Sequence, residues 1–155
     1  EGATEPLVIM NTHFDAFAQG TDTMQKQVAT VLKRLTELDA MNRPWILGGD
    51  FNLLPSELAY QQLPSSEQAS YRQQTELKPL LDRYPSVPPI SKMNGPQAAD
   101  WFTYFSNDPA ISQPDRTIDY VFVSKGTQLS NQTVRRHDTL KISDHLPVIL
   151  SVKLN

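Results

Sequence analysis

The sequence predicts an α/β protein in which a mixed β-sheet carries helices on one face. Two short apolar runs, residues 7–10 and 45–47, have the length of strands and are too short for helices. The amphipathic segment 21–41 lies between them, which indicates a right-handed crossover between parallel strands. Two later strands, 118–124 and 148–154, have polar residues at or just before their starts. If all the polar groups meet at one edge, these later strands run antiparallel to the first two.

Length and composition are those of one domain, residues 1–155, with 39% apolar and 20% charged residues. No apolar run reaches the roughly 20 residues of a membrane helix, and no secretory leader is recognisable. The absence of cysteine excludes disulfides, thiolate metal ligands and a cysteine nucleophile. The net charge of −3 excludes a global positive field for nucleic acid, so a polyanion would have to bind locally.

Residues 21–41 are predicted to form one long helix, capped by Thr21, Asp22 or Thr23. Apolar residues recur every three or four positions, with charged residues mostly between them. The Asn-Arg-Pro sequence at 42–44 ends the helix, because proline disfavours the helical conformation in the residue before it. The apolar positions are Met24, Val28, Val31, Leu32, Leu35 and Leu38.

The middle of the chain is predicted to be less regular. Short helices are expected at 56–63, with Ser56 as the cap, and at 75–84. The proline-rich segment 85–96 is expected to be irregular, either as a surface loop or as a wall of a binding cleft. Aromatic and β-branched residues predict a strand at 101–105, and a polar edge strand is expected at 133–139.

Polar side chains follow the first two strands. Asn11 and His13 share one side of the extended segment that ends the first strand. If the segment after the second strand is also extended, Asp50 and Asn52 share one side while Phe51 points to the core. Carboxylate and amide oxygens suit a hard cation or a phosphoryl group. The same Gly-Gly-Asp-x-Asn sequence also suits a tight turn.

Polar side chains precede or begin the later strands. Asp119 begins an apolar strand, where burial of a carboxylate without a partner would cost several kcal/mol, so a partner is expected. Asp144 and His145 come shortly before Pro147, which favours an extended conformation for this segment. Adjacent residues there point in different directions, so one can face a metal while the other faces a nucleophile.

Together these residues predict one site with three carboxylates, an amide and two imidazoles. Parallel strands present their carboxyl ends at one edge of a sheet, and antiparallel strands present their amino ends at that same edge. The combination suits a divalent cation with a histidine as general base toward water. Neither a glycine-rich phosphate loop nor a His-x-x-x-His zinc helix is present in the sequence.

Four motifs in this order, N-T-H-F-D, G-G-D-F-N, I-D-Y-V-F-V-S and S-D-H-L-P-V, resemble the endonuclease/exonuclease/phosphatase superfamily with the deoxyribonuclease I-like fold. The resemblance spans nearly the whole chain. It implies a four-layer α/β sandwich, of which this chain would form the second half. It also implies hydrolysis of phosphoesters such as DNA, RNA, sphingomyelin or inositol phosphates, generally with Mg²⁺, and with Mn²⁺ as an alternative.

The resemblance further implies roles for individual residues. His145 would be the base that activates water or stabilises the transition state, oriented by a hydrogen bond to Asp119. Asp50 and Asn52 would position the nucleophile and the phosphoryl oxygens, and His13 would bind a phosphate oxygen or assist the leaving group. The resemblance also implies that Asn11 contacts the substrate and that Asp144 and Asp50 face the metal ion.

The chain departs from the family pattern in length. Members are about twice as long, and their first half supplies an asparagine and the glutamate that is the principal metal ligand. Nothing in this sequence matches that half, so the chain is expected to be a fragment lacking the N-terminal half, with weak Mg²⁺ binding and little activity alone. One sheet face would then be apolar and uncovered, favouring association with the missing half or self-association.

Two classes of function follow from the sequence. The first is a metal-dependent phosphoesterase, and the alternative is a non-catalytic interaction module on the same fold. Retention of the polar groups that the motifs require favours the enzyme. The substrate could be nucleic acid, a phospholipid headgroup or a small phosphoester, and the acidic net charge argues mildly against a nonspecific nuclease.

Overall fold

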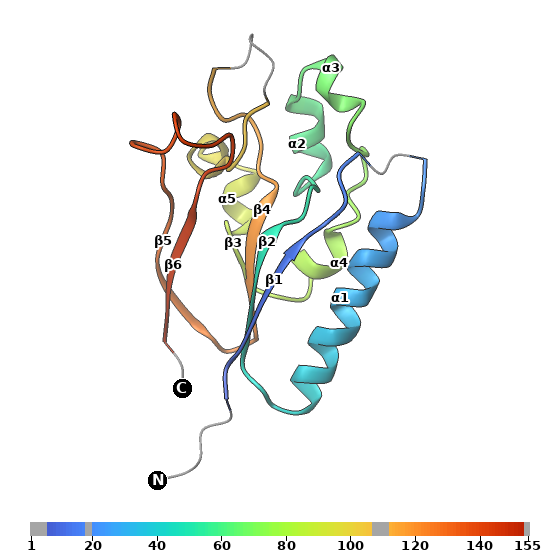
Figure 1. The fold of residues 1–155 in the computed structure, drawn as a ribbon, viewed down its shortest axis with the longest axis vertical. Helices are drawn as coiled ribbons and strands as arrows, with labels where there is room; N and C mark the ends of the chain where they lie inside the picture. Colours follow the sequence, from blue (N-terminus) through green and yellow to red (C-terminus); the bar gives the residue numbers. More distant parts are fainter. Residues whose placement is uncertain (1–5, 18–19, 107–111, 154–155) are drawn as a thin grey trace.

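The computed structural model of the chain describes residues 6–17, 20–106 and 112–153. Its centre is a four-stranded sheet of order β1-β2-β4-β3 (Figure 1). The strands β1 and β2 are parallel, whereas β4 is antiparallel to β2 and to β3. This arrangement confirms the predicted mixed sheet. The strand bounds are Val8–His13 for β1, Trp45–Asp50 for β2, Ser86–Val87 for β3 and Asp119–Val123 for β4.

The long crossover helix α1 (Thr23–Ala40) joins β1 to β2, close to its predicted bounds. Ser56 caps α2, as expected, by accepting a hydrogen bond from the Ala59 amide at 3.2 Å. The helix expected at 75–84 is shorter, because Pro79 fits only its first turn. The remaining helices are α2 (Glu57–Gln62), α3 (Ser65–Gln68), α4 (Lys78–Leu81), α5 (Ile90–Met93) and the 3₁₀ helix η1 (Ala98–Trp101).

The core lies between the sheet and the layer that contains α1 and α4, so the prediction of helices on one face is confirmed (Figure 1). Leu35 from α1, Trp45 from β2 and Phe122 from β4 are fully buried there. Phe51 packs edge-on against Phe122, with ring centroids 5.3 Å apart, and so anchors the chain directly after β2. No helix in the described part of the chain is long and apolar enough to cross a bilayer.

The last two strands, β5 (Gln128–Val134) and β6 (Val148–Lys153), form a separate antiparallel pair. Figure 1 shows this pair on the side of the central sheet away from α1. The expectation that the last strand joins the central sheet is therefore wrong. The strand expected at 133–139 is also misplaced, because residues 135–142 form successive turns, in which the Thr139 hydroxyl donates to the Arg135 carbonyl at 2.7 Å.

Two other segments differ from expectation. The segment 85–96, expected to be irregular, contains β3 and α5. The segment 101–105, expected to be a strand, begins at the end of η1 and forms only isolated bridges at Tyr104, to Arg116 and to His145. Only Tyr104 of this segment pairs with the neighbouring backbone, and one residue is too short to form a strand.

Candidate active site

One rung of the central sheet brings three of the predicted site residues together. His13 at the end of β1 pairs with Asp50 at the end of β2. Asp50 in turn pairs with Asp119 at the start of β4. Residues that pair directly across strands project on the same face, so these three side chains share one edge of the sheet.

His145 reaches the same edge from the segment before β6 and lies between the two carboxylates. Its Nδ1 is 3.1 Å from both carboxylate oxygens of Asp119, and its Nε2 is 3.8 Å from Oδ2 of Asp50. Because a carboxylate only accepts hydrogen bonds, Nδ1 carries the proton and the neutral ring keeps its lone pair on Nε2. Nε2 is too far from Asp50 for a hydrogen bond, so its lone pair is available to accept a hydrogen bond from a donor.

The two carboxylates shape the electrostatics of this cluster. The hydrogen bond that His145 donates to Asp119 raises the pKa of His145, against the opposing effect of burial. Burial also raises the pKa of Asp50, and repulsion from Asp119 adds to this rise. Three residues each offer one ligand atom here, namely Asp50, Asp119 and His145. These three atoms lie within 4.8 Å of one another, which fits a divalent cation.

Asn52 also lies at this edge, but its backbone is not in the expected extended conformation. Its φ is +50°, so the chain turns sharply after Phe51 and strict alternation of side chains ends there. The Asn52 amide N–H donates to Oδ1 of Asp50 at 2.8 Å, and its side-chain Nδ2 donates to the Phe14 carbonyl at 3.0 Å. The turn interpretation of Gly-Gly-Asp-x-Asn is therefore correct, and Asn52 ties the ends of β1 and β2 together.

The other predicted residues lie at or near this edge. Asn11 and His13 are exposed on the face opposite α1, where they line a groove of about 470 Å³ with Asp50 and Asp119. His13 Nε2 is 3.5 Å from Oδ2 of Asp50. Asp144 is half-buried beside His145 and lies outside the three-residue cluster that could hold a cation. The roles assigned to these residues from the sequence stay predictions.

Sequence reasoning missed Thr103, which positions both members of the Asp119–His145 pair. Its fully buried hydroxyl accepts hydrogen bonds from the backbone N–H groups of Ile118 and Asp119, each at 3.1 Å. Its carbonyl accepts a hydrogen bond from the Leu146 N–H at 2.6 Å. The start of β4 and the segment of His145 are thus held by one residue. No spacing signal in the sequence marks it, because it lies within an aromatic run.

We expect Thr103→Val to lower the free energy of unfolding by about 2 kcal/mol, because two buried N–H donors lose their acceptor. Urea unfolding measures the change. Thr30→Val, at an exposed position on α1, is the matched control and should change stability by less than about 0.5 kcal/mol. Equal stabilities for the two variants would contradict the assigned role of the Thr103 hydroxyl.

These features are found in a known family. The family model described as "Endonuclease/Exonuclease/phosphatase family" matches residues 12–145, and the chain belongs to this family. Its fold is generally that of metal-dependent enzymes that hydrolyse phosphoesters, and the cluster of Asp50, Asp119 and His145 provides a candidate cation site. No significant match is found among curated proteins.

One solved structure supports the fold, and a second is reported beside it. A mannosyl-6-phosphatase from Bacteroides thetaiotaomicron is similar, with a TM-score of 0.50 and 22% identity, over 93% of this chain and 50% of that one. An endonuclease/exonuclease/phosphatase family protein from the same organism gives a TM-score of 0.49 and 22% identity, over 92% of this chain and 48% of that one. The chain thus spans about half the length of these structures.

Proposed function

We propose that the protein is a divalent-metal-dependent phosphoesterase that uses activated water. The observation that carries this proposal is the position of His145, whose ring lies between the carboxylates of Asp119 and Asp50. In this proposal Asp119 holds the ring and stabilises its protonated form, while the Nε2 lone pair accepts the proton of the attacking water. The neutral ring is therefore the competent form.

Asp50 and Asp119 are the proposed ligands of the cation, which would be Mg²⁺ or Mn²⁺, and Asp144 lies nearby, beside His145. When bound, the cation supplies the positive charge that a phosphoryl group needs as negative charge develops on its oxygens. The raised pKa of Asp50 fits this assignment, since burial and repulsion from Asp119 both disfavour the charged carboxylate, which a bound cation would stabilise.

Substrate contacts are assigned to Asn52 at the edge of the sheet and to the groove on its open face. Asn52 has one amide hydrogen committed to the Phe14 carbonyl, and its second can donate to a phosphoryl oxygen. His13 and Asn11 are exposed along the same groove and can contact the phosphate or the leaving group. The net charge of −3 favours a small phosphoester or a lipid headgroup over nonspecific binding of nucleic acid.

We also propose that residues 1–155 act as one domain within a longer protein. The solved structure with the higher score is about twice as long as this chain, and Ile9 is 73% exposed on the open face of the sheet. A further α/β layer seated on that face would cover Ile9 and complete the cation site. Alone, the chain should bind Mg²⁺ weakly, hydrolyse slowly and tend to associate with itself through this face.

Hydrolysis by the chain and by its complete open reading frame tests the proposal. Both proteins are assayed with bis-p-nitrophenyl phosphate, p-nitrophenyl phosphate, a sugar phosphate, sphingomyelin and DNA, with Mg²⁺, Mn²⁺ or EDTA. We expect the longer protein to hydrolyse at least one substrate, with EDTA lowering the rate by at least about 100-fold. Hydrolysis unaffected by EDTA would contradict the role of the metal. If the longer protein hydrolyses none of the substrates, a non-catalytic interaction module would be favoured.

The pH dependence of hydrolysis tests the assignment of the base. Asp119 raises the pKa of His145, so the acidic limb of kcat/KM should lie above the ordinary histidine range. In Asp119→Asn this stabilisation of the protonated ring is lost, and we expect the limb to move to lower pH while the rate also falls. A pH–rate profile of both proteins measures the shift. If the acidic limb stays at the same pH in Asp119→Asn, the group that titrates is not His145.

A further inference from the structure

The wall of the site beside Asn52 contains a fully buried cation, Arg116, whose orientation is fixed. Its Nε and Nη2 donate to the two carboxylate oxygens of Asp115 at 2.7 and 2.9 Å. Its Nη1 donates to Glu67 at 2.7 Å. The guanidinium is 2% exposed, so its charge is balanced inside the protein and is not offered to solvent.

Two tyrosine rings flank this guanidinium, and both extend toward the site. Its carbon atom lies 5.5 Å from the ring centroid of Tyr71 and 5.4 Å from that of Tyr104. Tyr104 packs in turn on the imidazole of His145, with ring centroids 4.7 Å apart. The buried cation thus packs on two tyrosine rings, of which Tyr104 also packs on the candidate base and Tyr71 lines a cavity with Asn52.

The hydroxyl of Tyr71 keeps a hydrogen available for a ligand. The guanidinium of Arg116 interacts with the phenol oxygen, and because a guanidinium only donates, that oxygen is the acceptor. No acceptor for the phenol hydrogen is found among the described residues. Burial raises the pKa of Tyr71, and the charge of Asp50 contributes to the rise, so the phenol stays protonated at neutral pH.

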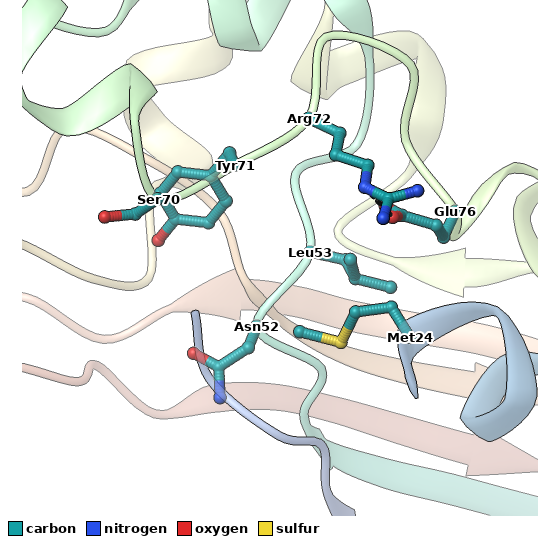
Figure 2. Close-up of a pocket in the computed structure, with 7 residues that line it drawn as sticks. All are labelled: Met24, Asn52, Leu53, Ser70, Tyr71, Arg72 and Glu76. Carbon is teal, nitrogen blue, oxygen red and sulfur yellow. Dashed lines mark ion pairs between the residues drawn. The ribbon is translucent and has the colours of Figure 1, made fainter. Parts of the chain in front are cut away.

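Tyr71 also lies next to a residue assigned to substrate. With Asn52 it lines a cavity of about 20 Å³, room for one water-sized group. Figure 2 shows Tyr71 and Asn52 on one side of this cavity and the Arg72–Glu76 ion pair on the other. The ion pair satisfies its own charges, at 3.1 Å, so the other polar side chains that line the cavity are those of Asn52, Ser70 and Tyr71.

We propose that Tyr71 is a substrate-binding residue, which donates its phenol hydrogen to a phosphoryl oxygen beside the Asn52 amide. The inference rests on the proposed function and adds to it a donor from the segment between α3 and α4. A neutral donor suits this position, because it can contact a phosphoryl oxygen without competing with the cation for Asp50. The ligand class is a phosphate or phosphoester dianion.

Titration calorimetry of the complete open reading frame with inorganic phosphate, in the presence of Mg²⁺, tests the inference. Tyr71→Phe keeps the ring that packs on Arg116 and removes only the hydroxyl. We expect it to raise the Kd for phosphate about five- to tenfold, the effect of losing one hydrogen bond, and thermal unfolding shows that the variant is folded. Tyr60→Phe is the matched control, since Tyr60 packs on the same apolar cluster and is not assigned to the site. It should bind phosphate as the wild type does.

The outcomes separate this inference from the proposed function. Normal phosphate affinity in Tyr71→Phe, with binding by the wild type intact, overturns the inference and leaves the proposed function standing. An equal loss of affinity in Tyr60→Phe also overturns it, because the effect then belongs to the whole cluster. If the complete open reading frame with its wild-type sequence neither binds phosphate nor hydrolyses phosphoesters, both proposals fail. In the active protein, a raised KM with little change in kcat would support binding by Tyr71.

Discussion

Replacement of His145 by alanine is expected to lower phosphoester hydrolysis by about 1,000-fold, within the range found for loss of a general base. The physical reason is that Nε2 of His145 is the basic atom that lies between the two carboxylates, 3.8 Å from Asp50. Without the imidazole, Asp119 can no longer stabilise a protonated base. The variant is assayed against the wild type with the best substrate of the panel, both in this chain and in the complete open reading frame.

His137→Ala is the matched control for that measurement. His137 is exposed in the turns between β5 and β6 and is not part of the cluster at the sheet edge. It should hydrolyse substrate at the wild-type rate, and thermal unfolding should show that both variants are folded. If His145→Ala retained more than about a tenth of the activity, a general base other than His145 would be required.

The position of this cluster could be predicted from the sequence, because it depends on local patterns. A strand–helix–strand crossover makes β1 and β2 parallel, so the polar residues that follow them meet at one edge. Asp119 could be added because a carboxylate at the start of an apolar strand needs a partner, and it has one in His145. Asn52 was harder to place, since the same residues suit an extended segment and a turn, and tertiary contacts with Phe14 and Asp50 decide for the turn.

The supporting residues could not be predicted, because their contacts join distant parts of the chain without any periodic signal. Thr103 binds the start of β4 through a side-chain oxygen, and the aromatic run around it predicts only a strand. Arg116 pairs with Glu67, which is 49 residues away in the chain. The separate pairing of β5 with β6 could not be predicted either. Alternation of apolar and polar residues indicates a strand, but it does not indicate which strand pairs with it.

Gly49 is the residue of the central sheet at which a single methyl group should have the largest effect on stability. Gly49 pairs with Thr12 across β1 and β2, and its φ is +155°. A Cβ atom at Gly49 would lie 1.9 Å from the Thr12 carbonyl oxygen, far inside van der Waals contact. The Gly49→Ala protein must therefore separate β1 from β2, one rung away from the His13–Asp50 pair. We expect the free energy of unfolding to fall by at least about 4 kcal/mol.

The adjacent glycine provides the control in the same strand. A Cβ at Gly48 would meet its nearest neighbour, Cγ2 of Val121, at 3.5 Å, which is an ordinary contact. Gly48→Ala should therefore change stability by no more than about 1 kcal/mol. Urea unfolding of both variants measures the difference. Because the two substitutions add the same methyl group to neighbouring positions, equal stabilities would show that the β1–β2 contact is not tight at Gly49, and the close approach that aligns His13 with Asp50 would then need another cause.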